Sequence, residues 1–306
     1  MKVLIVGLGS IAKKHIEALR TLQPNCAIHA LRSSPTANTE EGIESIYDID
    51  EAKLGFDFAI ISNPTYLHYE SIKCLAQKKI PLFIEKPPLH SLENAAELIA
   101  VVEHNKVVNY VACNLRFHPC IVFLKENIIK KDNRINEINV YCGSYLPEWR
   151  SGVDFKTVYS ANANMGGGVH LDMFHELDYT TWLFGMPNRT TSILRNVSSL
   201  EIEAIDYANY TLEYNTFAVN IVLNYYRKKP KRVIEIVFDN QTLIIDLINN
   251  SIKDDNEKII FAADGFVLKD TYVAQLNYFT TLLATNQNSF NSLRESLDVL
   301  KIVLQK

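Results

Sequence analysis

Residues 3–12 have the sequence Val3-Leu4-Ile5-Val6-Gly7-Leu8-Gly9-Ser10-Ile11-Ala12, in which a short apolar run ends in glycines and continues into a helical pattern. A G-x-G-x-x-G/A pattern between a strand and a helix is typical of dinucleotide binding, because the glycines allow a tight turn and let a diphosphate approach the backbone. The helix that follows would direct its unpaired N–H groups and the positive end of its dipole at the phosphates. We therefore expect a dinucleotide site here; the alternative is a glycine turn in another kind of α/β protein. The expected contact residues are Gly7, Gly9, Ser10, Ile11 and Ala12.

The composition describes a globular chain and argues against several other classes of protein. The 306 residues are 47% hydrophobic, which allows one large domain or two ordinary ones. A net charge of -4 gives no electrostatic case for nucleic-acid binding, and no apolar run is long enough to span a bilayer. A strand pattern follows Met1 directly, so we expect no signal peptide. The five cysteines form no metal-spaced pair, so we expect reduced thiols, no metal site and a cytoplasmic protein.

The residues after the second expected strand, 26–31, bear on the choice of cofactor. In NAD-binding domains a carboxylate at this place, roughly twenty residues past the glycines, binds the ribose hydroxyls. Here the chain has Arg32, Ser33 and Ser34 instead. A guanidinium makes charge-assisted bonds to phosphate oxygens, so these residues favour NADP(H), with its 2′-phosphate, over NAD(H). The alternative is an exposed arginine in a polar loop.

Further strand patterns at 56–62, 80–84 and 106–113 are each followed by polar residues. In a parallel sheet the carboxyl ends of the strands face the ligand. Lys86, directly after a buried strand, lies either at this crevice or on the surface, and Pro87 is a candidate for a cis peptide bond that would direct the lysine. The polar residues expected beside the cofactor are Asn63, Thr65, His68, Glu85, Lys86, Asn114 and Arg116. For His68 the alternative is a histidine at a helix start with no further role.

From about residue 119 the pattern changes to short strands separated by turns, which is typical of a mostly antiparallel sheet. The strands are expected at 135–141, 190–198, 205–212, 217–225, 231–239 and 241–247, and the helices at 121–129, 272–283 and 292–303. We therefore expect an α/β Rossmann domain over 1–118 and an α+β domain with an open sheet over 119–289. A terminal helix, about 290–306, would pack on the first domain. Tyrosines of the strands, Tyr225 among them, are expected on a sheet face or at an interface rather than at a ligand.

A glycine run, Gly166–Gly168, precedes a helical pattern over 171–182 that carries Asp172 and His175. Residues three apart share a helix face, and a carboxylate beside an imidazole holds its tautomer and raises its basicity, as proton transfer requires. The alternative is a polar pair on a solvated face. His170 is a second candidate histidine. Candidates for gripping a polar substrate such as a sugar ring, each of which could equally be structural, are Trp149, Arg150, Asp154 and Tyr159.

Taken together, these motifs resemble those of the glucose–fructose oxidoreductase / inositol dehydrogenase / rhizopine catabolism (Gfo/Idh/MocA) family. The resemblance rests on Gly7-x-Gly9-x-x-Ala12, Asn63-Pro64-Thr65 with His68, Glu85-Lys86-Pro87 and Asn114-x-Arg116, with the Glu-Lys-Pro turn the most specific of them. It implies that Lys86 lies beside the nicotinamide ring and the substrate hydroxyl, that His175 matches the family histidine, and that the open sheet pairs subunits. The chain departs from the family in Pro88 and in the spacing from Asp172 to His175, which is three where four is usual.

The resulting hypothesis is an NAD(P)-dependent oxidoreductase that transfers a hydride between nicotinamide C4 and a secondary alcohol or ketone of a sugar, sugar derivative or polyol. His175 would exchange the hydroxyl proton, Lys86 would polarise the same oxygen, and Asp172 would orient one of them. We expect a homo-oligomer, a dimer or tetramer, paired through the second sheet. The alternatives are a redox-neutral glycosidase of the same family and a non-catalytic NADP-binding protein.

Overall fold

The computed structural model describes residues 1–34, 40–50, 55–129, 133–285 and 289–305. Lys306, at the end of the expected terminal helix, lies outside the described residues. The chain divides into two compact units, the first formed by Met1–Asn114 with Leu268–Leu300 and the second by Leu115–Val267 with Lys301–Lys306. The first boundary therefore falls at 114/115, where the sequence placed it at 118/119, and the chain returns to the first unit at Leu268, before the last two helices.

The first unit contains a six-stranded parallel sheet with the strand order β3-β2-β1-β4-β5-β6. The strands are β1 Lys2–Val6, β2 Ala27–Leu31, β3 Ile43–Ile46, β4 Phe58–Ile61, β5 Leu82–Ile84 and β6 Asn109–Val111. The four residues of β4 are all buried, as expected of a strand covered on both faces. The order reverses direction between β1 and β4, and ligands of such sheets bind at the carboxyl ends of the strands on either side of that point. The Rossmann arrangement is thus confirmed.

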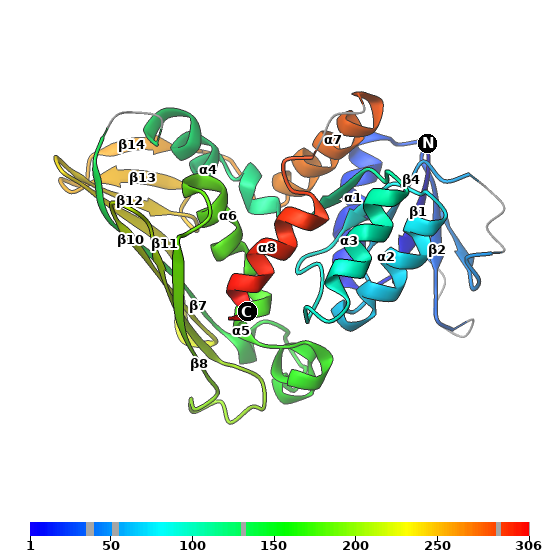
Figure 1. Ribbon diagram of the computed structural model, residues 1–306, viewed down its shortest axis with the longest axis horizontal. Coiled ribbons are helices and arrows are strands. Elements are labelled where there is room, and N and C mark those ends of the chain that lie inside the picture. The colour runs from blue at the N-terminus through cyan, green and yellow to red at the C-terminus, as the bar shows by residue number, and fades with distance from the viewer. Residues whose placement is uncertain (35–39, 51–54, 130–132, 286–288, 306) are drawn as a thin grey trace. The chain divides into compact units, whose positions relative to one another are not determined.

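Helices cover this sheet on both faces (Figure 1). They are α1 Ser10–Leu22, α2 His68–Gln77, α3 Ala95–His104, α7 Asp270–Thr285 and the start of α8 Leu293–Val303. The sequence placed α7 in the second domain, but it packs beside α1, and Phe279 lies edge-on to Phe58 and Phe83 of the sheet. At the start of α8, the Leu293 N–H donates to Asn109 Oδ1 of β6 at 2.7 Å. The chain thus returns to complete the core of its first unit.

The second unit contains an eight-stranded sheet with the order β14-β13-β12-β11-β7-β10-β9-β8. The strands are β7 Ile135–Tyr145, β8 Arg189–Arg195, β9 Tyr207–Glu213, β10 Ala218–Asn224, β11 Tyr226–Phe238, β12 Thr242–Asp246, β13 Ser251–Asp254 and β14 Ile259–Ala262. All neighbours are antiparallel except β7 and β10, so the expected mostly antiparallel sheet is confirmed. The sequence missed β13 and β14, the last two strands on one side of the sheet, because each is only four residues long and shows little apolar pattern.

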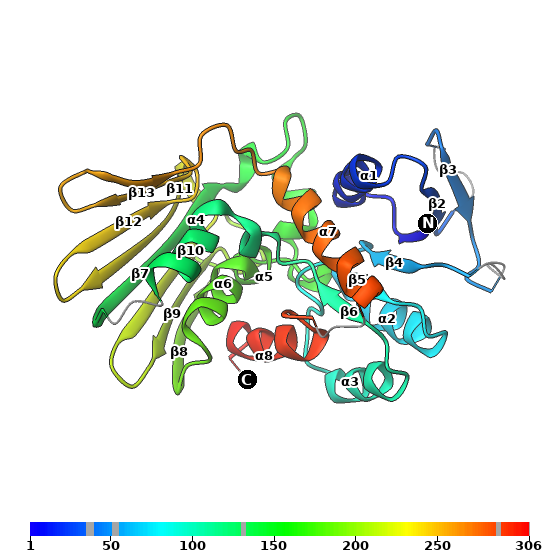
Figure 2. The same ribbon diagram turned by 90° about the horizontal axis from the view of Figure 1, so that it is seen from above.

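Three helices of this unit, α4 Pro119–Phe123, α5 Val169–Asp172 and α6 Phe174–Phe184, lie on one face of the sheet (Figure 2). The continuous helix expected over 171–182 is wrong, because Met173 leaves helical geometry at φ −95° and ψ 35° and separates α5 from α6. Asp172 and His175 therefore lie on different helices and do not share one helix face. Nine of the eleven residues of α6 are buried, which is why its sequence shows little amphipathic pattern.

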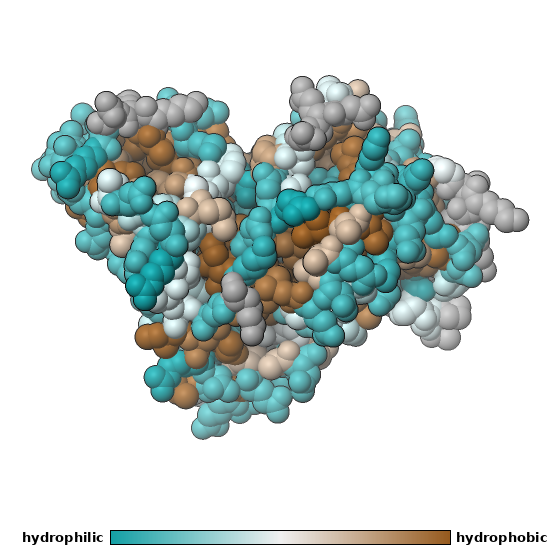
Figure 3. Space-filling model, in the orientation of Figure 1, coloured by the Kyte–Doolittle hydropathy of each residue, from teal (hydrophilic) through white to brown (hydrophobic). Residues whose placement is uncertain are grey.

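The surface is largely polar where Figure 3 shows it, with apolar side chains gathered in smaller patches. Among the described residues, no helix combines the length and the apolar character needed to cross a bilayer. The five cysteines, all of them described, form no disulfide bond.

Candidate functional site

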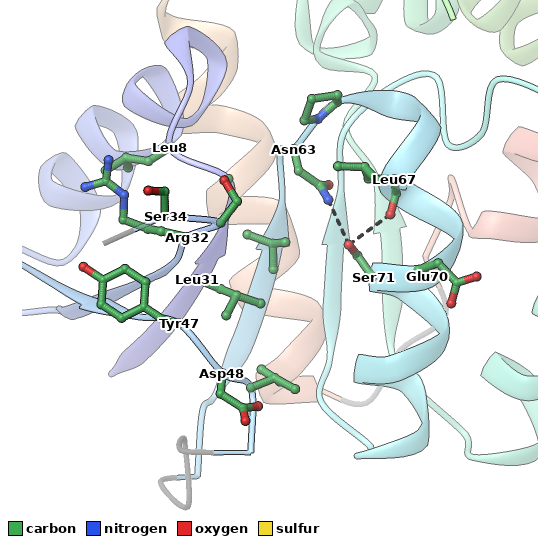
Figure 4. A pocket seen from close by; sticks show the side chains of 15 residues that line it. Leu8, Leu31, Arg32, Ser34, Tyr47, Asp48, Asn63, Leu67, Glu70 and Ser71 are labelled. Atoms are coloured by element: carbon green, nitrogen blue, oxygen red, sulfur yellow. Dashed lines mark hydrogen bonds between the residues drawn. The ribbon is translucent and has the colours of Figure 1, made fainter. Parts of the chain in front are cut away.

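A cavity of about 570 Å³ lies at the carboxyl ends of the first four strands of unit 1 (Figure 4). Arg32, Ser33 and Ser34 line it on the side of β2, and Asn63 lines it on the side of β4. The lining residues that were not expected as contacts include Tyr47, Asp48, Ile49, Leu67, Glu70 and Ser71. Tyr47 and Asp48 directly follow β3, so the rule that ligands bind at the carboxyl ends of parallel strands could have found them.

The glycines and Asn63 shape this cavity for a dinucleotide. Gly7 has φ +82°, and a Cβ there would lie 2.6 Å from the Asn63 Cα, so a side chain is excluded. Gly9 precedes α1, and nothing stands within 4 Å of where its Cβ would be, which leaves the helix N-terminus open to a phosphate. Asn63 donates to Ser71 Oγ at 2.9 Å, and its buried Oδ1 accepts from no group in the described part of the chain. The Asn63 Oδ1 atom can accept from a ligand hydroxyl, and the N-terminus of α1 can bind a phosphate, so the two together fit a ligand that carries both groups.

Of the residues expected beside the cofactor, five line the cavity: Gly7, Arg32, Ser33, Ser34 and Asn63. Ten do not: Gly9, Ser10, Ile11, Ala12, Thr65, His68, Glu85, Lys86, Asn114 and Arg116. Among these, His68, Asn114 and Arg116 are bonded to protein groups. His68 is 1% exposed, with Nδ1 3.1 Å from the Pro88 carbonyl and Nε2 3.0 Å from the Asn63 carbonyl, so it ties together the turns after β4 and β5. Burial lowers the pKa of His68, against the opposing effect of these backbone bonds. The Asn114 amide donates to Thr271 Oγ1 at 2.6 Å, and Arg116 donates through Nε and Nη2 to Asp178 at 2.9 and 2.7 Å.

The turn that carries Lys86 is anchored by a buried contact between Glu85 and His15. Glu85 is 7% exposed, its Oε1 lies 2.5 Å from His15 Nε2 of α1, and its Oε2 accepts from the Lys86 N–H at 3.1 Å. Burial favours the neutral form of Glu85, but the hydrogen bond from His15 and the charges of His15 and Lys86 outweigh it and hold the pKa below its usual value. The Lys86–Pro87 peptide is cis, as the sequence suggested. His15 was not among the residues expected at the site, so sequence reasoning missed this anchoring role.

In the second unit, three predicted residues and one missed residue form a cluster around a carboxylate. Asp172 accepts from the Tyr159 hydroxyl at Oδ1, 2.7 Å away, and from the Tyr225 hydroxyl at Oδ2, 2.5 Å away. The Trp149 ring lies edge-on to Tyr225 at 5.3 Å, and the Arg150 guanidinium lies 5.6 Å from the centre of the Tyr159 ring. Tyr225 was expected on a sheet face or at an interface, and its position 53 residues away from Asp172 gave no local signal of this contact.

Asp154 lies outside this cluster, whereas Gly167 packs against the backbone of Tyr159. Asp154 stands apart from the carboxylate and caps a short helical turn, where it accepts from the Lys156 N–H at 3.0 Å. A Cβ at Gly167 would lie 2.0 Å from the Tyr159 carbonyl oxygen, so the glycine run is needed for the segment before it to pack closely. That packing places Tyr159 against Asp172.

The two candidate histidines are both buried. Burial lowers the pKa of His170 to about 4, against a smaller opposing effect of Asp172, so its imidazole is neutral at pH 7. Its Nδ1 has no hydrogen-bond partner within the described ranges. His175 lies on α6 next to two ion pairs whose carboxylates are buried: Glu176 with Arg232 at 2.6 Å, and Asp178 with Arg116. These two ion pairs connect α6, which carries His175, to Arg116 and to Arg232 of β11. Among the described residues, no cluster of His, Cys, Asp or Glu could hold a metal ion.

Two family models match successive parts of the chain. Residues 1–113 match the model described as an oxidoreductase family with an NAD-binding Rossmann fold, and residues 131–244 match the GFO/IDH/MocA C-terminal domain. The chain belongs to the Gfo/Idh/MocA family. The family resemblance drawn from the turn motifs is therefore confirmed.

Among its Gfo/Idh/MocA relatives, the chain is 26% identical over 235 residues to the uncharacterised oxidoreductase YrbE of Bacillus subtilis, covering 72% of this chain and 65% of that one. It is 27% identical over 198 residues to the scyllo-inositol 2-dehydrogenase (NADP+) IolW of the same organism, covering 58% and 51%. These alignments span less than two thirds of either relative.

Solved structures share the fold at low sequence identity. A levoglucosan dehydrogenase in complex with NADH superposes with a TM-score of 0.85 at 15% identity, over 100% of this chain and 96% of that one. The UDP-N-acetylglucosamine 3-dehydrogenase GnnA of Acidithiobacillus ferrooxidans gives a TM-score of 0.80 at 18% identity, with the same coverage.

Proposed function

We propose that this protein is an NAD(P)-dependent oxidoreductase acting on a secondary hydroxyl, or the matching ketone, of a sugar, sugar derivative or polyol. The proposal depends on what lies at the carboxyl ends of the parallel strands. A cavity beside an open helix N-terminus follows β1 to β4, and the anchored turn with Lys86 follows the neighbouring strand β5. Family relatives named as scyllo-inositol 2-dehydrogenases for NADP+ and for NAD+ support the class of reaction.

In this proposal a bound nicotinamide dinucleotide supplies or accepts the hydride. The glycine turn and the start of α1 bind its diphosphate, and Asn63 Oδ1 accepts from a hydroxyl. Lys86 donates a hydrogen bond to the reacting substrate oxygen and stabilises the charge that develops there. During oxidation His175 takes the proton of that hydroxyl, and during reduction it returns one to the new alkoxide oxygen.

We also propose a preference for NADP(H). Arg32, Ser33 and Ser34 all line the cavity, where they can donate to a 2′-phosphate. For the assembled protein we propose a homo-oligomer paired through the second sheet and a cytoplasmic location, in keeping with cysteines that form no disulfide. Light scattering that gives the mass of a single chain would contradict the oligomer.

The test is turnover of a panel of sugars and polyols with NADP+ and NAD+, read from nicotinamide absorbance. Lys86→Ala and His175→Ala should each lower kcat by about 10²–10⁴-fold while NADP+ affinity changes little, because proton transfer and polarisation act on the reacting oxygen. Lys253→Ala, at an ion pair with Glu257, and the exposed His104→Ala serve as matched controls and should keep the wild-type rate.

Wild-type rates in both site variants would contradict the site. Cleavage of a glycoside with no net change in absorbance would instead establish the redox-neutral alternative, and tight NADP+ binding without turnover of any sugar would indicate a binding protein.

A further inference from the structure

We propose that Ser71 is a positioning residue of the first-unit cavity: it fixes the side-chain amide of Asn63 so that the amide oxygen, and not the nitrogen, faces a bound dinucleotide. The inference rests on the proposed cofactor site and adds to it a residue that selects for a ligand group able to donate a hydrogen bond. Ser71 lies on α2, Asn63 lies two residues past the end of β4, and both line the cavity.

The direction of two hydrogen bonds decides which end of the amide faces the serine. Ser71 has one hydroxyl proton, and its Oγ donates to the Leu67 carbonyl oxygen, 3.0 Å away, which can only accept. Because the proton is used in that bond, the Ser71 oxygen can act toward Asn63 only as an acceptor. The group of Asn63 that faces it is therefore the donor Nδ2, at 2.9 Å (Figure 4).

This arrangement leaves the amide oxygen of Asn63 as the end that a ligand can use. Oδ1 is buried and accepts from no group within the described ranges of the chain. A buried acceptor without a donor costs free energy, so a ligand hydroxyl that donates to it gains more than it would at an exposed oxygen. A reversed amide would present N–H donors at the same point. Ser71 thus makes this point of the cavity an acceptor.

The backbone around Asn63 is held by groups other than Ser71. A Cβ at Gly7 would lie 2.6 Å from the Asn63 Cα, so the turn after β1 packs directly against this residue. The Asn63 carbonyl oxygen lies 3.0 Å from His68 Nε2. Loss of the Ser71 hydroxyl should therefore free the rotation of the amide and leave the backbone of the cavity in place.

The alternative is a purely local role for Ser71 in α2. Serine and threonine side chains often donate to the carbonyl four residues earlier in a helix, as Ser71 does to Leu67. Thr21 of α1 makes the same local bond, with Oγ1 donating to the Glu17 carbonyl at 2.9 Å, and it does not line the first-unit cavity. Thr21→Ala is therefore the matched control for the loss of such a bond.

The experiment is a double-mutant cycle between Ser71→Ala and Asn63→Ala, measured by calorimetric titration with NADPH or NADH, whichever the wild type binds more tightly. Ser71→Ala should weaken binding about 3–10-fold, as expected for one neutral hydrogen bond. In the Asn63→Ala background it should change affinity less than about 2-fold, because its effect passes through the amide. The stoichiometry of each titration reports whether the variant is folded.

Two further variants separate the amide from the helix. Ser71→Thr keeps a hydroxyl at the same position and should bind within about 2-fold of the wild type. Thr21→Ala should do so in both backgrounds. A second measurement needs no ligand: the NMR signal of the Asn63 side-chain amide, identified by its absence from Asn63→Ala, should shift in Ser71→Ala and stay in place in Thr21→Ala.

The outcomes separate this inference from the proposed function. Wild-type affinity in Ser71→Ala, an equal loss in both backgrounds, or an unmoved Asn63 amide signal overturns the inference, and turnover of a sugar by the wild type still upholds the oxidoreductase. If the wild type binds a dinucleotide but oxidises or reduces no sugar of the panel, the oxidoreductase falls and the cycle still decides the role of Ser71. If it binds neither dinucleotide, both fall.

Discussion

Arg32 is the residue whose chemistry bears most directly on the choice between the two nicotinamide dinucleotides. It follows β2 and lines the first-unit cavity together with Ser33 and Ser34 (Figure 4). A guanidinium bound to a 2′-phosphate contributes about 1.5–3 kcal/mol per charge-assisted bond, and it has no such partner on NADH. Arg32→Ala should therefore weaken NADPH binding about 10–100-fold and leave NADH binding within about 3-fold, as measured by calorimetric titration.

Arg294→Ala is the control for lost positive charge, since Arg294 pairs with Glu103 on the surface at 2.7 Å. It should bind both dinucleotides as the wild type does. A wild-type protein that binds NADH more tightly than NADPH would contradict the proposed preference.

At the scale of elements, α6 carries His175, and its position depends on ion pairs with other parts of unit 2. Arg116 and Asp178, 4% and 0% exposed at their side chains, form a two-point pair. Removing one partner leaves a buried charge uncompensated, which costs about 3–5 kcal/mol. Arg116→Met should lower the free energy of urea unfolding by about this amount while NADPH affinity stays near the wild-type value, because the arginine acts on α6 and not on the cofactor.

The double variant Arg116→Met/Asp178→Leu removes both charges and should recover most of the lost stability, since a well-packed apolar pair can replace a buried ion pair. If Arg116→Met instead lost NADPH affinity and kept the wild-type free energy of unfolding, the result would support the sequence-based expectation that Arg116 contacts the cofactor.

At the scale of the whole molecule, buried neutral histidines make the folded state sensitive to acid. His118 is 1% exposed; its Nδ1 accepts from the Cys120 N–H at 3.2 Å, and its Nε2 lies 3.2 Å from the Leu247 carbonyl. Burial lowers its pKa to about 4, against the opposing hydrogen bonds to the Leu247 carbonyl and the Asn250 side chain, and burial lowers the pKa of His170 to about 4 as well. In the unfolded chain both titrate near their usual value of about 6.5.

Between about pH 6.5 and pH 4 the unfolded chain therefore binds more protons than the folded one. The contribution of the two neutral histidines to the free energy of unfolding is fully present above about pH 6.5 and is lost as the pH drops through this window. Each histidine contributes about 1.4 kcal/mol per pH unit there. His118→Gln should reduce the slope of the free energy of unfolding against pH by the contribution of one histidine, about 1.4 kcal/mol per pH unit, as measured by urea unfolding at pH 7, 6 and 5. The exposed His104→Gln is the control, and an unchanged slope in His118→Gln would contradict the expectation.

The sequence by itself determined the first unit closely, because its signals are local. The turn from Val6 to Ala12 needs glycine at a positive φ and a helix directly after it, and both requirements are met within ten residues. The same holds for the Lys86–Pro87 turn and for the strands whose apolar runs are buried on both faces. Patterns of this kind report backbone conformation and burial, which neighbouring residues specify.

Only the tertiary structure decided which polar side chains meet. Asp172 and Tyr225 are 53 residues apart, and Arg116 and Asp178 are 62 apart, so no periodicity links either pair. The sequence placed Asp172 beside His175 on one helix, but Met173 breaks that helix, and the carboxylate is bonded to two tyrosines instead. A side chain's hydrogen-bond partner depends on which strands and helices pack together, and local spacing along the chain carries no information about that.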